Sequence, residues 1–206
     1  MDDLRKTNLS NSVKEGFLTG NALLSSGVII APAVVAATNL MSAVCLAIVF
    51  TVVTYVTVAL CSFVPKKVVY TARIIIYTFL ASLVYVPVAL LLEIIMPETM
   101  TAVGIYAPLL ITNSFITSKS ELKFYRHERK NMLVLLAFYV LGYDTALILF
   151  GAMRGLLISG SVLGIKLLNF PLPSLSSVYG GFIFLAVSSA LYRGIMRYVI
   201  RKGNAQ

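Results

Sequence analysis

The chain has 206 residues, of which 59% are hydrophobic and only 12% are charged. A soluble domain averages about 45–50% apolar and about 25% charged residues, so this composition leaves too few polar side chains to coat a water-soluble globule, and it excludes intrinsic disorder. The net charge of +9 does not indicate a nucleic-acid partner, because the basic residues form short clusters between long apolar runs. We therefore expect an integral membrane protein.

Apolar stretches, taken in chain order, predict six membrane-spanning helices, since a helix needs roughly 20 apolar residues to cross a bilayer. Residues 21–63 carry no charge, and the polar pair Thr38-Asn39 divides this stretch into two spans. The first and fourth spans are short and contain Pro32 and Pro108. The six predicted spans are residues 23–37, 40–63, 69–92, 103–117, 132–157 and 178–200.

The distribution of Lys and Arg predicts that both chain termini are cytoplasmic. With the N-terminus inside, the four cytoplasmic segments hold 15 of the 17 basic residues, and the loop after the third span carries only Glu93 and Glu98. Cytoplasmic loops are enriched in Lys and Arg, so we expect a multi-pass protein of a bacterial or archaeal cytoplasmic (inner) membrane, in contact with the lipid bilayer. Residues 1–20 form a polar lead without signal-peptide features, and the first apolar run is expected to remain in the mature protein.

The order short, long, long occurs twice and predicts two three-helix repeats, residues 21–94 and 100–200, within one membrane domain of residues 1–206. Three spans per half would make the second repeat inverted relative to the first. Short, proline-interrupted segments at corresponding positions point to a site near the midplane, although proline is common in membrane helices. The matching motifs are Ala31-Pro32 and Thr38-Asn39 in one half, Ala107-Pro108 and Thr112-Asn113 in the other.

Four stretches resemble the paired six-helix membrane subunits of the Rnf and Nqr respiratory complexes. They are residues 20–38, 104–114, 141–164 and 180–183, and Pro-Leu-Leu-Ile-Thr-Asn at 108–113 is the most specific. The resemblance implies a subunit of a sodium- or proton-translocating complex that moves electrons from reduced ferredoxin or NADH. It also implies an oppositely oriented paralogous partner, with flavins and iron–sulfur clusters in partner subunits. The predicted orientation is similar to that of the Rnf E-type and Nqr D-type member.

The chain departs from this family at its iron–sulfur ligands. In the family, one cysteine from each short helix, contributed by both paired subunits, binds a 2Fe–2S cluster; the matching positions here are Ala31 and Ser114. Alanine has no donor atom, and a serine oxygen is a poor substitute for thiolate. Cys45 and Cys61 lie outside the short helices and are expected to be buried thiols. We therefore expect no metal or cofactor in this chain. A further departure is Gly155, where the family usually has an acid.

Asp144 lies in an apolar run, where ionisable groups mark ion pathways or paired charges. It is ten residues before Arg154, about 15 Å along one helix, so direct pairing of the two is not expected. Asp144 is interpreted either as a cation or proton site or as an interfacial residue paired with a loop base such as Lys130.

Other polar residues near the short spans have a structural and a functional interpretation. Asn39 and Asn113 are expected to satisfy backbone groups freed where the short helices break, with ion binding as the alternative. Together with Ser114, Asp144 and Arg154 they form the set of possible ion-path or midplane residues. His127 is expected to be a solvated loop residue, and the bases of loop 119–130 a topology signal.

The sequence shows no phosphate loop, no catalytic triad and no zinc spacing, so we expect a non-catalytic subunit of an ion-translocating oxidoreductase complex. An alternative from another class is the substrate-binding membrane component of a vitamin-type transporter. Its docking face could be the small-residue motif from Ala33 to Ala37, although such motifs are general to membrane helices. A stand-alone ion transporter built on the same repeat is a third possibility.

Overall fold

The structure, a computed structural model, describes residues 23, 29–65, 67–110, 129–162, 165–166 and 171–203. Four of the described helices are long and apolar enough to cross a membrane. Apart from the helices, the described residues form only a short antiparallel ladder between β1 (Ser161–Val162) and β2 (Ile165–Lys166). The prediction of an all-α, multi-pass membrane protein is confirmed at this level.

The four long helices follow the predicted apolar runs closely. Each begins and ends within three residues of its predicted span, because an uninterrupted apolar run in a membrane must satisfy its own backbone as a helix. They are α2 (Leu40–Cys61), α3 (Tyr70–Ile95), α7 (Arg129–Ser159) and α8 (Val178–Gly203).

The two stretches predicted as short spans are broken rather than continuous helices in their described parts. The first contains η2 (Pro32–Ala36), a single turn of π-helix that follows Ile29, whose φ is 63°. The predicted start of the fourth span, about residue 103, falls at the end of helix α4 (Pro97–Val103), and Gly104 then turns the chain with a φ of 51°. Helix α5 (Tyr106–Leu109) follows, and residues 111–117 lie outside the described residues.

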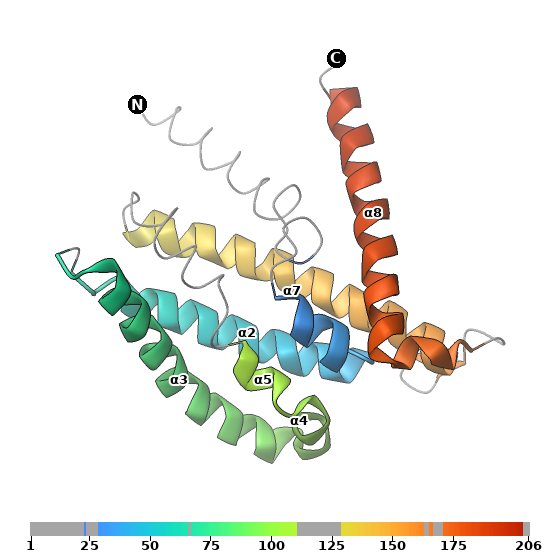
Figure 1. Ribbon diagram of the computed structural model, residues 1–206, viewed down its shortest axis with the longest axis horizontal. Helices are drawn as coiled ribbons and strands as arrows, with labels where there is room; N and C mark the ends of the chain where they lie inside the picture. Colours follow the sequence, from blue (N-terminus) through green and yellow to red (C-terminus); the bar gives the residue numbers. More distant parts are fainter. Residues whose placement is uncertain are drawn as a thin grey trace.

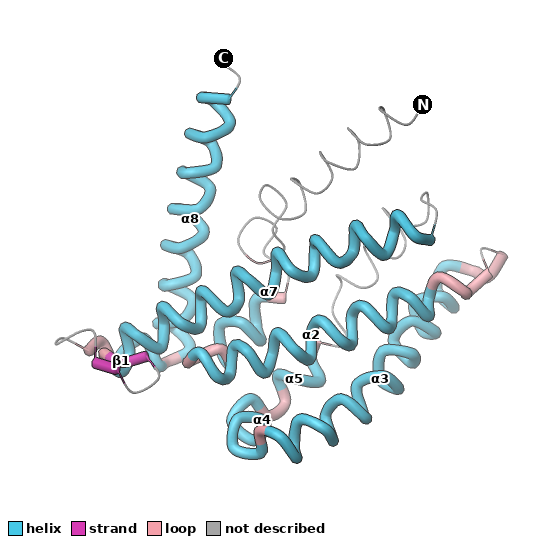
Figure 2. The backbone as a smooth tube through the Cα atoms, turned by 180° about the vertical axis from the view of Figure 1, so that it is seen from behind, coloured by secondary structure: helices cyan, strands magenta, loops and turns pink. Residues whose placement is uncertain are grey.

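Helices α2 and α7 form the core of the described structure and run antiparallel, side by side in both views (Figures 1 and 2). Their closest contacts show the direction, since Thr51 meets Asp144 whereas Ala43 meets Gly151. The rings of Phe50 and Tyr143 lie between the two helices with their centroids 4.2 Å apart. Together α2 and α7 carry more than half of the buried apolar side chains of the described structure.

Helices α3 and α8 lie at the periphery. α3 packs on α2 through one narrow stripe that includes Tyr77 and Ala81, and it curves along its length, with Pro87 inside the helix (Figure 1). α8 is held near its first turns, where Phe184 meets Phe150 at a centroid distance of 5.1 Å, and it then leaves the bundle (Figures 1 and 2). Most large apolar side chains of α3 and α8 are exposed, as suits helices that face lipid.

Candidate functional site

The two proline-bearing short segments lie against each other. η2 packs against α5, and it also contacts α2, α7 and α8. Pro32 begins η2 and Pro108 lies within α5. η2 ends at Ala36, so the carbonyl groups at its C-terminal end have no hydrogen-bond partner within a longer helix, and they need other partners inside a membrane. Ala33, Val34 and Ala37 are fully buried, so η2 is irregular backbone enclosed by the other helices.

Arg154 supplies those partners. Its guanidinium is completely buried, and its N–H groups donate five hydrogen bonds, all to backbone carbonyl oxygens, which matches the five donors that arginine carries. The acceptors are Val34, Ala37 (3.5 Å), Leu175 (2.9 Å), Ser176 (3.4 Å) and Ser177 (3.2 Å). We call Arg154 and these five carbonyl groups the Arg154 cluster.

The Arg154 cluster joins three parts of the chain. Arg154 comes from α7, two acceptors come from η2 and the residue after it, and three come from η5 (Pro173–Ser176) and the residue that precedes α8. A Cβ atom at Gly181 of α8 would lie 2.8 Å from both the Arg154 Nη2 and the Val34 oxygen. Only glycine therefore fits at this point of α8 without displacement of the cluster.

Two glycines bring α7 close to the start of α2. A Cβ atom at Gly151 would lie 2.4 Å from the Ala43 Cβ, and one at Gly155 would lie 3.1 Å from the Asn39 Cα. An acid at position 155, as in the resembled family, would need room that Asn39 occupies. With glycine at position 155, Arg154 has backbone carbonyl oxygens as its hydrogen-bond acceptors within the described structure.

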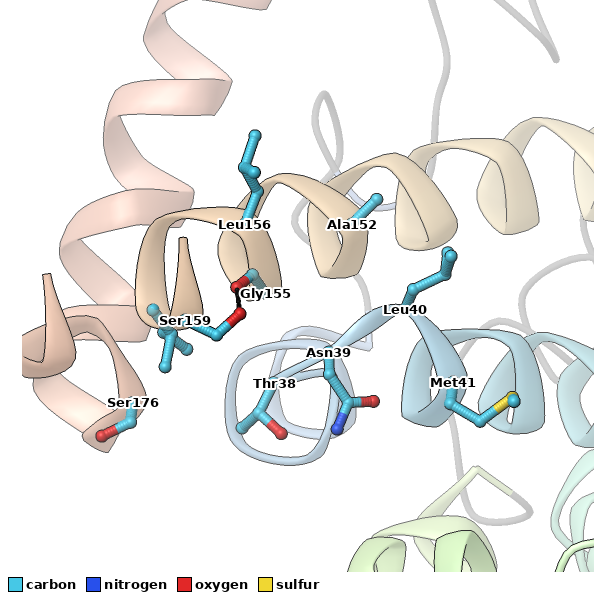
Figure 3. Close-up of a pocket in the computed structure, with 10 residues that line it drawn as sticks. Thr38, Asn39, Leu40, Met41, Ala152, Gly155, Leu156, Ser159 and Ser176 are labelled. Carbon is cyan, nitrogen blue, oxygen red and sulfur yellow. Dashed lines mark hydrogen bonds between the residues drawn. The ribbon is translucent and has the colours of Figure 1, made fainter. Parts of the chain in front are cut away.

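Asn39 is the N-cap of α2: its Oδ1 accepts a hydrogen bond of 2.8 Å from the Ser42 backbone N–H. This contact satisfies a helix-terminal donor, which is the structural role expected for Asn39. A cleft of about 440 Å³ borders it, lined also by Thr38, Gly155 and Ser159. In Figure 3 Thr38 and Asn39 lie at the turn that leads into α2, below the α7 residues Ala152 and Gly155.

Asp144 lies at the middle of α7 and faces α2. Its side chain is 8% exposed, and the Thr51 hydroxyl donates a hydrogen bond to its Oδ2. Its buried Oδ1 has no hydrogen-bond partner in the described part of the chain. Lys130 lies fourteen positions before Asp144 on the same helix, about 21 Å along its axis. The loop bases at 119–128 lie outside the described residues, so pairing of Asp144 with a loop base stays a prediction.

The residues at the family's iron–sulfur positions are only partly described. Ala31 immediately precedes η2 and is exposed, and Ser114 lies outside the described residues. Cys45 and Cys61 are 0% and 5% exposed within α2, so the prediction of buried thiols is confirmed. In the described part of the chain, no three His, Cys, Asp or Glu side chains are grouped as a metal site requires.

Asn113, His127 and residues 119–128 also fall outside the described residues. The small-residue face from Ala33 to Ala37 is described, and both alanines are fully buried within this chain. That burial removes the docking surface on which the vitamin-transporter alternative depends.

Sequence reasoning missed two groups of residues. The carbonyl acceptors around Arg154 carry no sequence signal, because any residue has a carbonyl group. The second group does carry a sequence signal, because a threonine occurs at every third position of an apolar helix, at Thr51, Thr54 and Thr57. The last two side chains are 1% and 0% exposed, and the oxygen atoms of their hydroxyl groups have no hydrogen-bond partner among the described residues.

Comparison with known proteins supplies the family. No curated protein matches the chain. The model of one family, described as Rnf-Nqr subunit, membrane protein, matches residues 9–195, which is 187 of the 206 residues. The buried, proline-broken segments and the apolar long helices are thus parts of a known type of complex subunit, and the chain belongs to the Rnf-Nqr family of membrane-protein subunits.

Proposed function

We propose that the chain is a divergent Rnf/Nqr-like subunit that contributes no ligand to a 2Fe–2S cluster and serves its ion-translocating electron-transport complex as a membrane scaffold and ion pathway. The family match over 187 residues supports the complex. The observation that carries the divergence is Ala31: it stands at the family's first cysteine position, exposed beside η2, with a methyl group in place of a thiolate. Ser114 stands at the second position.

The proposal includes six spans arranged as two inverted repeats, residues 21–94 and 100–200, in a single membrane domain. The contact between η2 and α5 supports it, because a repeat of this kind brings its two proline-bearing segments together. The excess of Lys and Arg in alternate loops supports a cytoplasmic N-terminus and C-terminus in an inner membrane. This is the orientation of the Rnf E-type and Nqr D-type member.

The proposed partners are an oppositely oriented paralogous subunit and further subunits that hold flavins and iron–sulfur clusters. A pairing surface beside η2 is open, since Ala31, Ile105 and Leu109 are all exposed there. Electrons would then pass through cofactors of the partners, and this chain would contribute packing and an ion path.

The test is purification of the native complex in mild detergent through a tag on this chain, followed by identification of the subunits and measurement of iron and flavin. We expect the paralogue and flavin-bearing subunits to co-purify. Recovery of the chain with ATPase subunits, or alone, contradicts the redox complex.

A matched variant tests the loss of the cluster. The double substitution Ala31→Cys, Ser114→Cys should add iron to the complex relative to the unmodified chain, because it restores thiolate donors at both family positions. Equal iron in the two preparations, with iron already bound to the unmodified chain, contradicts a cluster-less subunit.

A further inference from the structure

We propose that Asp144 is a proton-binding site in the middle of the membrane, reached along α2 from the end that adjoins residues 62–69. The proposal deepens the proposed function, and it rests on that function only for the process to which proton movement would be coupled. Three observations carry it: the position of Asp144, its incomplete hydrogen bonding, and a row of three threonines, two of them buried, on the helix that it faces.

The position of Asp144 is the centre of the bundle. The residue is the midpoint of the 31-residue helix α7, and its partner Thr51 lies midway along the 22-residue helix α2. A carboxylate held at the membrane centre is costly, so acids there mark ion paths or proton relays. More than nine-tenths of the side chain is buried.

The hydrogen bonding of Asp144 suits a group that is protonated for part of the time. A charged carboxylate has about four acceptor sites, and here only Oδ2 receives a hydrogen bond from a described residue. A neutral carboxyl group tolerates one partner far better than a carboxylate does. Sodium would need several oxygen ligands, whereas a proton needs only the carboxyl oxygen itself.

The surroundings of Asp144 contain no described charge that would hold it permanently ionised. On α7 the adjacent titratable group is Tyr143, and Arg154 lies about 15 Å along the helix with its donors bound to carbonyl oxygens. α2 contributes Cys45 and Cys61 as titratable buried groups.

The elements beyond α2 carry their charges away from the midplane. α3, which packs on α2, contributes the phenols Tyr77 and Tyr85, with Arg73 and Glu93 near its two ends. η2 carries no titratable side chain, and α5 contributes Tyr106. None of these described groups is an acid or base paired with Asp144.

The access route is a row of hydroxyl groups on α2. Thr51, Thr54 and Thr57 are three residues apart, so neighbouring Cβ atoms lie about 5–6 Å from one another on the helix surface. The buried Oγ1 atoms of Thr54 and Thr57 accept no hydrogen bond from, and donate none to, the described residues. The row begins at the hydroxyl that contacts Asp144 and leads toward the end of α2 at Cys61.

The proposed step transfers one proton and no electron. A hydronium ion from the aqueous phase beside residues 62–69 gives its proton to the Asp144 carboxylate, which leaves water and a neutral carboxylic acid. Because the gaps between the hydroxyl groups exceed one hydrogen bond, bridging water completes the row.

The test uses the full-length chain in proteoliposomes and dicyclohexylcarbodiimide, which reacts with protonated carboxyl groups in apolar surroundings. Mass spectrometry of the α7 peptide locates the modification. We expect labelling of Asp144 that is lost in Asp144→Asn and unchanged in Thr145→Val, a control at the adjacent exposed position of α7. Absence of labelling at Asp144 overturns the proposal, and protection by NaCl against a KCl reference overturns its choice of ion.

The access route is tested by setting a different pH on each side of the membrane. A Lys67→Cys variant, at an exposed position, reports through an impermeant maleimide which side holds residues 62–69. We expect carbodiimide labelling of Asp144 to fall only when the pH is raised on that side. In the double variant Thr54→Val, Thr57→Val we expect this response to slow about tenfold, equivalent to about 1.4 kcal/mol in a barrier. A response from the opposite side, or an unchanged rate, overturns the route. These assays need no partner subunit, so their failure is distinct from failure of the proposed complex.

Discussion

Arg154 and Asp144 are two buried charged side chains on one helix, and their surroundings are opposite in kind. Arg154 donates five hydrogen bonds to carbonyl oxygens of two other segments. Asp144 accepts one hydrogen bond, from Thr51, and its second oxygen has no partner among the described residues. Burial alone therefore does not tell the two roles apart; the number of satisfied hydrogen bonds does.

The difference teaches how a membrane subunit can hold irregular backbone and a functional acid on the same helix. Carbonyl groups freed at η2 must be satisfied inside the protein, and the guanidinium of Arg154 does this with its full set of donors. A group that changes its charge cannot be fixed in the same way, because each contact favours one protonation state. We infer that Arg154 is structural and that Asp144 is free to exchange a proton.

The largest expected effect is that of Arg154→Leu. The substitution leaves five carbonyl oxygens without their donor, those of Val34 and Ala37 in buried hydrogen bonds, and we expect a loss of about 3–5 kcal/mol in the free energy of unfolding, as for other broken buried charge networks. Thermal unfolding of the purified chain in detergent measures it. Arg154→Lys should recover only part of the loss, since lysine has three donors on one atom. An unfolding temperature unchanged in Arg154→Leu would show that the Arg154 cluster is dispensable.

Gly181→Ala is a second test of the Arg154 cluster. The new methyl group would lie 2.8 Å from the Arg154 Nη2, and overpacking of this kind costs about 1–3 kcal/mol. The matched control is Gly194→Ala on the same helix, where a Cβ atom meets nothing within 4 Å. We expect the control to be neutral or stabilising, and the cost of Gly181→Ala to shrink when Arg154 is already leucine. Equal costs in both backgrounds would separate Gly181 from the cluster.

The long helices could be predicted to within three residues of their ends, because an apolar run of membrane-spanning length must satisfy its own backbone as a helix. The separate helix α4 could not be predicted in this way. Residues 97–103 form a short helix that Pro97 begins and Gly104 ends, and both ends are set by single local residues, whereas hydropathy locates only long apolar runs. Pattern reasoning that follows hydropathy therefore does not predict α4 as a separate helix.

The residues of the candidate site could be predicted from the sequence, but the contacts that they make could not. Asp144 and Arg154 stand out as ionisable residues in apolar runs, and Asn39 stands out as a polar break before a long helix. The acceptors of Arg154 are backbone atoms that come together only in three dimensions. Thr51 became significant only once the antiparallel packing of α2 and α7 placed it against Asp144.

Asn39→Ala tests a polar residue that borders the Arg154 cluster but does not belong to it. The substitution removes the acceptor of the Ser42 N–H, and loss of an N-cap costs about 1 kcal/mol. Asn39→Ser, which retains a capping oxygen, is the control and should keep most of the stability. Unfolding curves of the two variants give the difference. A loss in Asn39→Ala as large as that in Arg154→Leu would mean that the cap contributes as much to stability as the guanidinium does.

We expect the smallest loss of stability from Asp144→Leu. A large loss in this variant would contradict the difference between Arg154 and Asp144. The substitution removes one hydrogen bond with Thr51 and an oxygen without a described partner. Hydrogen bonds between membrane helices contribute about 0.6 kcal/mol on average, and an apolar side chain of similar size avoids the cost of a buried carboxyl group. We therefore expect an unfolding free energy within about 1 kcal/mol of the unmodified chain, and a double-mutant cycle with Thr51→Val gives the coupling. A stable Asp144→Leu variant would exclude a structural role for the carboxyl group and leave proton exchange as its proposed role, whereas a loss equal to that of Arg154→Leu would make both charges structural.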